Sequence, residues 1–179
     1  LPLPTKQRVM INCNFTYSVH EDQRDRWIRD VADACKQLQL DYFISQHPRD
    51  KGVFPNDPIR PSHAGVVHEH LADSTILVTR FSTLIYEAML LGRRAIYYNP
   101  FGEKMRLFNE DRTHGLLKAF NAQQLTPTLE KATAAMDNAE RERFDLFLAL
   151  HCGASDGGAA SRVAKGLEWL AREANPLPK

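Results

Sequence analysis

The stretch ADSTILVTRFSTLIYEAMLLGRRAIYYNP, residues 72–100, decides the fold. Its first part, Ser74 to Arg80, is rich in β-branched residues, which favours a buried strand. Residues 83–91 follow as a helix, and Gly92 supplies the usual stop after a helix end. Residues 94–99 then form a second strand, which Pro100 halts. A strand, a helix and a strand in this order predict a parallel βαβ unit.

The same alternation extends over the rest of the chain. Residues 22–39 place Trp27, Ile28 and Val31 on one helical stripe. The segment from Pro48 to Pro61 holds four prolines and predicts an irregular loop. The fold class is therefore α/β, a Rossmann-like open, mostly parallel sheet with helices on both faces. The other predicted strands are 8–15, 41–47 and a short edge strand at 116–120; the other predicted helices are a turn at 66–71, one starting at Thr126-Pro127, 140–151 and 156–173.

Length and composition bound the functions open to the chain. With 179 residues, 43% hydrophobic and 25% charged, it suits one globular domain. The formal net charge of +1 argues against nucleic-acid binding and against a polybasic membrane-binding surface. No apolar run is long enough for a transmembrane segment. The sequence has no P-loop, no GxGxxG after the first strand and no GxSxG, and we expect no cofactor.

The three cysteines, Cys13, Cys35 and Cys152, lie far apart. Their spacing fits neither a disulfide framework nor a zinc site. We expect free thiols in a reducing, cytoplasmic compartment, and no metal.

The N-terminal sequence Leu1-Pro2-Leu3-Pro4-Thr5 has no Met and resembles a proline-rich linker. We therefore expect residues 1–7 to be a linker inside a longer protein. Residues 8–173 are then one ligand-binding domain, and residues 174–179 a tail.

In an open parallel sheet, ligands bind outside the carboxyl ends of the strands. Residues 12–20, 46–52 and 80–87 occupy that position. The second segment carries His47-Pro48-Arg49. Pro48 holds His47 in an extended conformation, and His47 and Arg49 can both donate to a phosphate. The alternative is an ordinary polar strand terminus.

The third segment carries Ser82 and Thr83 at the start of the predicted helix. Their hydroxyls and the free N–H groups of the first helical turn favour an anion. The alternative is that Ser82 merely caps the helix, and both roles are compatible. Glu87 lies one turn further, among apolar residues, where a carboxylate at the rim would accept the hydroxyls of a sugar ring. Its alternative is an exposed surface acid.

Other candidates are weaker. Asn12, Asn14 and Thr16 end the first strand and could line the ligand site at the carboxyl ends of the strands. Lys104 follows the strand that Pro100 halts and could lie over the same site. Asp156 stands in a Gly-rich helix entry, where a plain N-cap is the alternative. The histidines His63, His68 and His70 cluster without metal spacing, and we expect them to coat a loop and a short helix.

Residues 72–100 resemble the nucleotide-binding half of GT-B glycosyltransferases. The shared pattern is Ala-Asp, an apolar strand, Ser-Ser/Thr, a helix with Glu-Ala, a Gly turn and a strand. The upstream His47-Pro48, paired with Ser82-Thr83, resembles enzymes that use cytidine-activated donors: bacterial sialyltransferases, Kdo transferases of capsule and lipopolysaccharide synthesis, and CDP-glycerol polymerases of teichoic acid. FLALHCGASDGGAASRVAKGLEWL, residues 147–170, resembles the last helices of surface-polysaccharide transferases.

The resemblance implies roles for individual residues. His47, Pro48, Ser82 and Thr83 would form the donor-phosphate site, where His47 would stabilise or protonate the leaving phosphate without a metal. Glu87 would hold the nucleotide ribose. Thr79 stands where retaining enzymes with a Glu-x7-Glu motif have a second acid, which favours an inverting enzyme.

The partners implied are a nucleotide-activated sugar, with CMP-sugars favoured, a glycan or lipid-linked acceptor, and an N-terminal domain that brings the catalytic base. The longer protein would be cytoplasmic or peripheral at the inner face of the membrane. Three alternatives stay open: a UDP-GlcNAc 2-epimerase-like isomerase domain, a CDP-glycerol glycerophosphotransferase, and a non-catalytic α/β interaction module.

Overall fold

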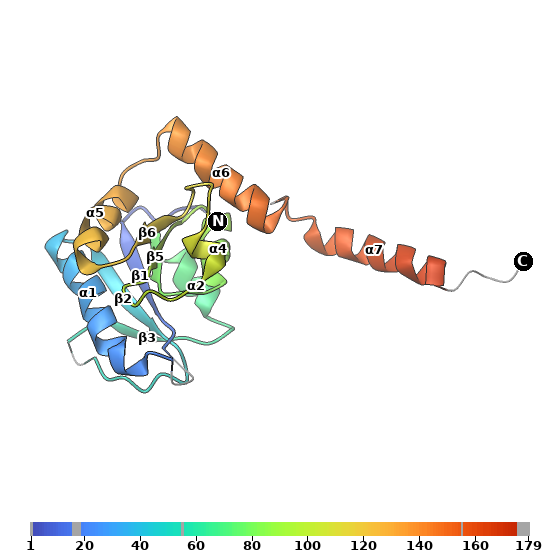
Figure 1. Ribbon diagram of the computed structural model, residues 1–179. Coiled ribbons are helices and arrows are strands. Elements are labelled where there is room, and N and C mark those ends of the chain that lie inside the picture. Colours follow the sequence, from blue (N-terminus) through green and yellow to red (C-terminus); the bar gives the residue numbers. More distant parts are fainter. Residues whose placement is uncertain (1, 16–18, 55, 155, 175–179) are drawn as a thin grey trace, which may run out of the picture.

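The computed structural model describes residues 2–15, 19–54, 56–154 and 156–174 (Figure 1). Six strands form one parallel sheet in the order β3-β2-β1-β4-β5-β6. The strands are β1 (Arg8–Cys13), β2 (Asp41–Gln46), β3 (Ile59–Pro61), β4 (Ile76–Thr79), β5 (Arg94–Tyr98) and β6 (Leu117–Ala119). The strand order changes direction at β1. β1 pairs with β2 on one side, toward β3, and with β4 on the other, toward β5 and β6. The predicted Rossmann-like fold is confirmed, with every pairing parallel.

The helices cover both faces of this sheet, as the alternation predicts. They are the 3-10 helix η1 (Glu21–Gln23), α1 (Arg24–Gln37), α2 (Val67–Ala72), α3 (Leu84–Leu90), α4 (Arg106–Asn109), α5 (Ala122–Thr133), α6 (Asn138–Cys152) and α7 (Ala159–Ala174). α1 and α5 pack on one face, and α2, α3 and α6 on the other.

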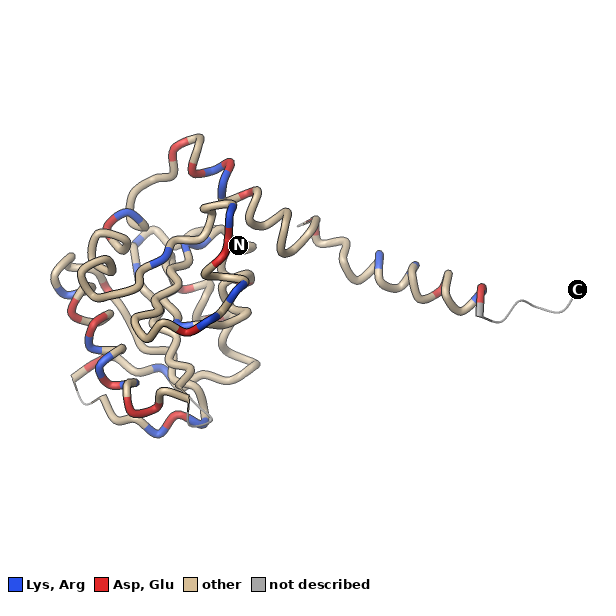
Figure 2. The backbone as a smooth tube through the Cα atoms, viewed as in Figure 1, with Lys and Arg blue, Asp and Glu red and all other residues tan. Residues whose placement is uncertain are grey.

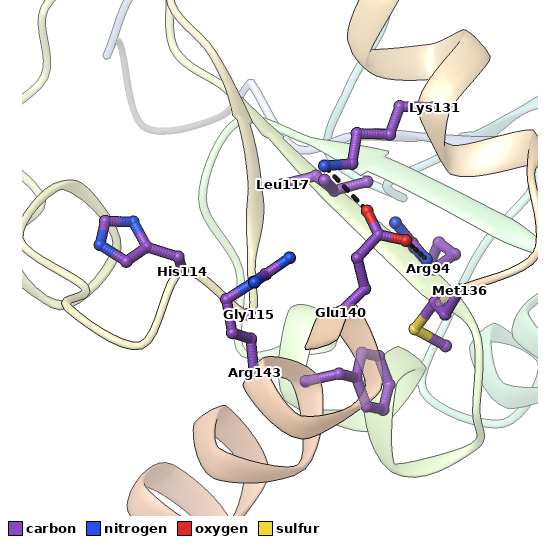
Figure 3. Close-up of a pocket in the computed structure, with 9 residues that line it drawn as sticks. Arg94, His114, Gly115, Leu117, Lys131, Met136, Glu140 and Arg143 are labelled. Carbon is purple, nitrogen blue, oxygen red and sulfur yellow. Dashed lines mark ion pairs between the residues drawn. The ribbon is translucent and has the colours of Figure 1, made fainter. Parts of the chain in front are cut away.

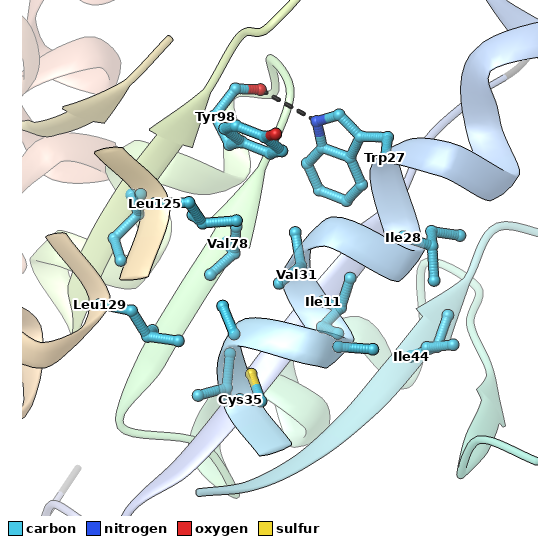
Figure 4. Close-up of a cluster of buried hydrophobic side chains, with 14 of the residues drawn as sticks. Ile11, Trp27, Ile28, Val31, Cys35, Ile44, Val78, Tyr98, Leu125 and Leu129 are labelled. Atoms are coloured by element: carbon cyan, nitrogen blue, oxygen red, sulfur yellow. Dashed lines mark hydrogen bonds between the residues drawn. The ribbon is translucent and has the colours of Figure 1, made fainter. Parts of the chain in front are cut away.

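The period of two along the strands separates the two cores. In β1, Val9 and Ile11 face α1 and α5, while Met10 faces α2 and α3. Figure 4 shows the first core, in which Trp27 of α1 donates its indole N–H to the carbonyl of Tyr98 at 3.0 Å. This bond joins α1 to the carboxyl end of β5.

Two predicted elements were wrong. The proline-rich segment is not wholly irregular, because Ile59–Pro61 forms the edge strand β3 beside β2. Pro61 is tolerated because it ends an edge strand. The helix expected to start at Thr126-Pro127 starts earlier, at Ala122: the Asn121 side chain accepts from the Gln124 N–H at 2.9 Å, and Pro127 lies inside α5.

The chain projects away from its compact body at the C-terminus (Figure 1). Residues 159–173 of α7 are all exposed, including Val163, Leu167, Trp169 and Leu170. α7 therefore contributes little to the core of the domain. Figure 2, which colours the backbone by residue type, shows acidic and basic positions interspersed along the chain, in keeping with the formal net charge of +1.

Candidate functional site

A pocket of about 260 Å³ opens at the carboxyl ends of β1, β2, β3 and β4. This is the side of the sheet on which ligands of open α/β folds bind. Five of the side chains predicted from the sequence meet there: Asn12, Asn14, His47, Pro48 and Ser82. The full lining is Asn12, Asn14, His47, Pro48, Ser62, His63, Ala64, Val67, Ser82 and Leu84.

His47 is held at this mouth by its backbone. Its N–H donates to the Cys13 carbonyl at 3.2 Å, which ties the end of β2 to the end of β1. Its carbonyl accepts from the Asp50 N–H at 2.9 Å. Arg49, expected to add a donor, is exposed and does not line the pocket; its N–H donates to His47 Nδ1 at 3.2 Å.

Ser82 lines the pocket, as predicted. It is not the N-cap of α3, which is Thr83, but its hydroxyl oxygen accepts from the Leu84 N–H at 3.1 Å and so satisfies a donor of the first helical turn. Thr83 is exposed and lies outside the lining.

Two asparagines connect the carboxyl ends of the neighbouring strands β1 and β4. Asn12 is buried and donates to the Thr79 hydroxyl at 3.0 Å, and Asn14 donates to the Phe81 carbonyl. Asn14 Oδ1 is buried and accepts no hydrogen bond from the residues that the structure describes. It can therefore accept from a bound ligand. Thr16, predicted beside them, lies outside the described residues.

Glu87 has a protein partner that its sequence position did not reveal. Its Oε2 lies 2.5 Å from His68 Nε2, so the pair joins α3 to α2. Glu87 is not part of the pocket lining, although Val67 and Leu84, near the pair in sequence, both are. The Glu87 side chain is 37% exposed, and Oε1 makes no hydrogen bond to any residue that the structure describes.

Two weaker candidates lie away from the pocket. Lys104 is exposed in the loop after β5. Asp156 lies between α6 and α7, where its carboxylate accepts from the Gly158 N–H and pairs with Arg162 at 2.9 Å. Asp156 thus closes a short turn before α7 and does not cap the helix, because the N–H that it accepts from belongs to Gly158, which precedes Ala159.

The loops around the mouth are fastened by a buried ion pair. Arg80, at the end of β4, donates to both carboxylate oxygens of Glu103, at 2.5 and 2.7 Å. Both side chains are at least nine-tenths buried. Arg80 also donates to the Val19 carbonyl and lies between the rings of Phe15 and Phe81. One arginine therefore links the loops that follow β1, β4 and β5.

A second set of buried contacts, around Asp50, connects the loop after His47 to β1 and α1. The Cys13 thiol donates to Asp50 at 2.7 Å, and Asp50 also pairs with Arg24 at 3.0 Å. Burial, and then the hydrogen bond to Asp50, raise the pKa of Cys13 far above its usual range, so the thiol stays protonated. All three cysteines are free, as expected, and Cys152 is only half-buried.

The structure separates the three clustered histidines. His70 is buried, with Nδ1 3.0 Å from the Ser45 hydroxyl, and burial lowers its pKa. His68 pairs with Glu87, and His63 lines the pocket. The expectation that the three coat a loop and a short helix is confirmed for His63, which is exposed in the loop after β3, and for His68, which is exposed on α2; it was wrong for His70, which is buried. Only contacts between β2, β3 and α2 reveal these roles.

A smaller cavity of about 20 Å³ lies on the opposite side, at the amino ends of β5 and β6 (Figure 3). Glu140 pairs there with Lys131 at 2.8 Å and with Arg94 at 3.8 Å. No residue predicted for ligand binding lines it. These ion pairs fasten α5, α6 and β5 together.

Among the described residues, no cluster of three His, Cys, Asp or Glu side chains is arranged to hold a metal ion. Within the same ranges, no helix has the length and apolar character needed to cross a bilayer.

Comparison with known proteins shows the fold. No family model and no curated protein matches this chain. Among solved structures, the calicheamicin glycosyltransferase CalG4 matches with a TM-score of 0.64 at 17% identity, over 98% of this chain and 46% of CalG4. The wall teichoic acid polymerase TagF matches at 0.55 and 18%, over 98% and 46%.

The spinosyn rhamnosyltransferase SpnG, solved with thymidine diphosphate, matches at 0.60 and 12% identity, over 91% of this chain and 46% of SpnG. The chain thus spans about half the length of these structures. Its fold is that of one half of a GT-B glycosyltransferase.

Proposed function

We propose that this chain is the donor-nucleotide-binding domain of a glycosyltransferase, which transfers a sugar from a CMP- or other nucleotide-activated donor to a cell-surface polysaccharide or lipopolysaccharide acceptor. The observation that carries the proposal is the pocket at the carboxyl ends of the strands, where His47, Pro48 and Ser82 converge. Imidazole and hydroxyl donors at such an edge suit a phosphate.

The reaction is substitution at an anomeric carbon with inversion. The acceptor hydroxyl attacks, and the bond to the donor phosphate breaks with its electron pair going to the phosphate oxygen. His47 and Ser82 would stabilise the charge that develops on that oxygen, without a divalent metal. The catalytic base would come from another part of the full protein, since we assign none to this chain.

Glu87 would hold the ribose. Its helix position, one turn beyond Ser82 and Thr83, and its partly exposed carboxylate support this role. His68 would then position the carboxylate through the 2.5 Å contact.

The test is nucleotide binding by the chain of 179 residues. Calorimetric titration with CMP, CDP, UDP and TDP should show binding, with cytidine nucleotides preferred. Tighter binding of UDP would move the assignment toward enzymes of UDP-sugars, including a 2-epimerase-like isomerase. Binding of none of the four would favour a non-catalytic module and overturn the proposal.

A second candidate is a glycerophosphotransferase that uses a CDP-linked donor. The match to TagF, which has also been solved after soaking with CDPG, favours it. Product analysis with the full-length protein separates the two: a transferred sugar supports the first, and a transferred glycerophosphate the second.

A further inference from the structure

Two histidines, not one, face the candidate pocket. His47 follows β2, and His63 follows β3 by two residues. Both line the same cavity, together with Ser62 and Ser82. Adjacent parallel strands end at the same edge of the sheet, so two separate loops deliver the two imidazoles to one place.

The same local hydrogen bond orients both rings. The Arg49 N–H donates to His47 Nδ1 at 3.2 Å, and the Gly65 N–H donates to His63 Nδ1 at 3.1 Å. A ring nitrogen that accepts a hydrogen bond carries no proton, so each neutral ring carries its proton on Nε2. Both histidines therefore present an Nε2–H donor.

The backbone around His63 is fixed as firmly as that around His47. The His63 carbonyl accepts from the N–H groups of Val66 and Val67, both at 3.0 Å, at the entry to α2. A Cβ placed on Gly65 would lie 3.1 Å from His63 Cε1, so the ring rests closely against this glycine. A donor held in place before binding loses little conformational entropy when the ligand arrives.

We infer that His63 is a second phosphate-binding residue, and that His47 and His63 donate paired Nε2–H bonds to phosphoryl oxygens of the ligand. The nature of the ligand rests on the function proposed above. The pairing itself rests on the shared cavity and the two matching Nδ1 contacts. The two Nε2–H donors come from separate loops to one cavity, so they can contact the same phosphate.

Two substitutions at His63 separate the donor from the local turn. Asn keeps an acceptor where Nδ1 lies and retains the contact with the Gly65 N–H, but it has no group at the place of Nε2. Gln places an amide N–H near Nε2. We expect His63→Asn to weaken CDP binding about tenfold or more, as for loss of a hydrogen bond to a charged group, and His63→Gln to recover most of that loss.

The matched control is His114→Asn. His114 is exposed, lines the small cavity at the opposite edge, and has φ 56°, which Asn tolerates. Its substitution should leave the CDP affinity unchanged. A second readout is ¹⁵N NMR of the imidazoles near pH 8, which should show protonated Nε2 for both His47 and His63 and a shift of both Nε2 signals when CDP is added.

Wild-type affinity in His63→Asn, or a proton on Nδ1 of His63, would overturn this inference and leave the proposed function standing. A wild-type chain that binds none of CMP, CDP, UDP and TDP would overturn the proposed function, and with it the ligand assigned to the histidine pair.

Discussion

At the scale of single residues, the candidate site consists of short polar side chains whose positions are set by neighbouring backbone groups. His47, His63 and Ser82 each accept a hydrogen bond from an N–H two residues later. Such contacts leave the opposite end of the imidazole, or the hydroxyl proton, available to a ligand. Hydrogen bonds within the chain therefore orient these three side chains.

The role of Glu87 leads to a prediction about nucleotide selectivity. Glu87→Gln keeps the shape of the side chain but removes its charge, and charge-assisted hydrogen bonds contribute roughly 1.5 to 3 kcal/mol. We expect CDP to bind about tenfold more weakly, with little change for the 2′,3′-dideoxy analogue. Calorimetry on both ligands is the measurement. Equal losses for the two, or none, would show that Glu87 serves only the contact with His68.

The buried pair Arg80–Glu103 leads to a prediction about stability. Glu103→Gln leaves the Arg80 charge buried without its carboxylate, and breaking a buried pair in this way costs about 3 to 5 kcal/mol of unfolding free energy. Urea denaturation followed by circular dichroism measures it. The control is Asp156→Ala, which breaks a pair with about half of each side chain exposed and should cost much less. A similar small loss for Glu103→Gln would contradict the fastening assigned to the pair.

At the scale of elements, the contact of α5 and α6 with β5 should respond to pH. The hydrogen bond from Lys131, and then the charge of Arg94, lower the pKa of Glu140. A lowered carboxyl pKa stabilises the fold above the ordinary glutamate pKa of about 4.3, and this stabilisation is lost as the pH falls through the lowered value.

We therefore expect Glu140→Gln to melt below wild type at pH 7 and to approach wild type as the pH falls below about 4. Calorimetric melting between pH 7 and pH 3 provides the comparison. A difference in melting temperature that stays constant over this range would mean that the Glu140 charge does not stabilise the contact.

The isolation of α7 leads to a prediction about truncation. Because residues 159–173 are all exposed, a chain of residues 1–157 should unfold within about 0.5 kcal/mol of the full chain. A chain of residues 1–137 is the control: it also lacks α6, whose Phe144 and Phe147 are buried, and should be much less stable. Strong destabilisation of the 1–157 chain in urea would show that α7 packs against the body in solution.

At the scale of the whole molecule, the chain corresponds to about half the length of each solved structure that it resembles. CalG4, TagF and SpnG are each covered over 46% of their length. We therefore expect this chain alone to bind a nucleotide without transferring a sugar. The measurement is release of CMP or CDP from activated donors in the presence of acceptor glycans. Robust turnover would contradict the expected division of the protein, in which residues 8–173 form only the donor domain.

Much of this molecule follows from the sequence by itself. The β-branched runs, the helical stripes and Gly92 act over a few neighbouring residues, so they determined the alternation of strands and helices and hence the parallel sheet. The same local logic placed His47, Pro48 and Ser82 at strand ends, and the rule for open sheets brought them to one edge. The edge strand β3 could not be predicted in this way, because a strand of three residues is too short to show a period of two.

Only the tertiary structure decided the contacts between segments distant in the sequence. His63 joins His47 because β3 pairs with β2, and His68 meets Glu87 because α2 lies beside α3. His70 is buried beside Ser45 for the same kind of reason. A local sequence pattern indicates which face of a helix or strand a residue occupies. The residue that it contacts depends on the order of the strands and the packing of the helices, and these are determined by burial of apolar surface over the whole chain.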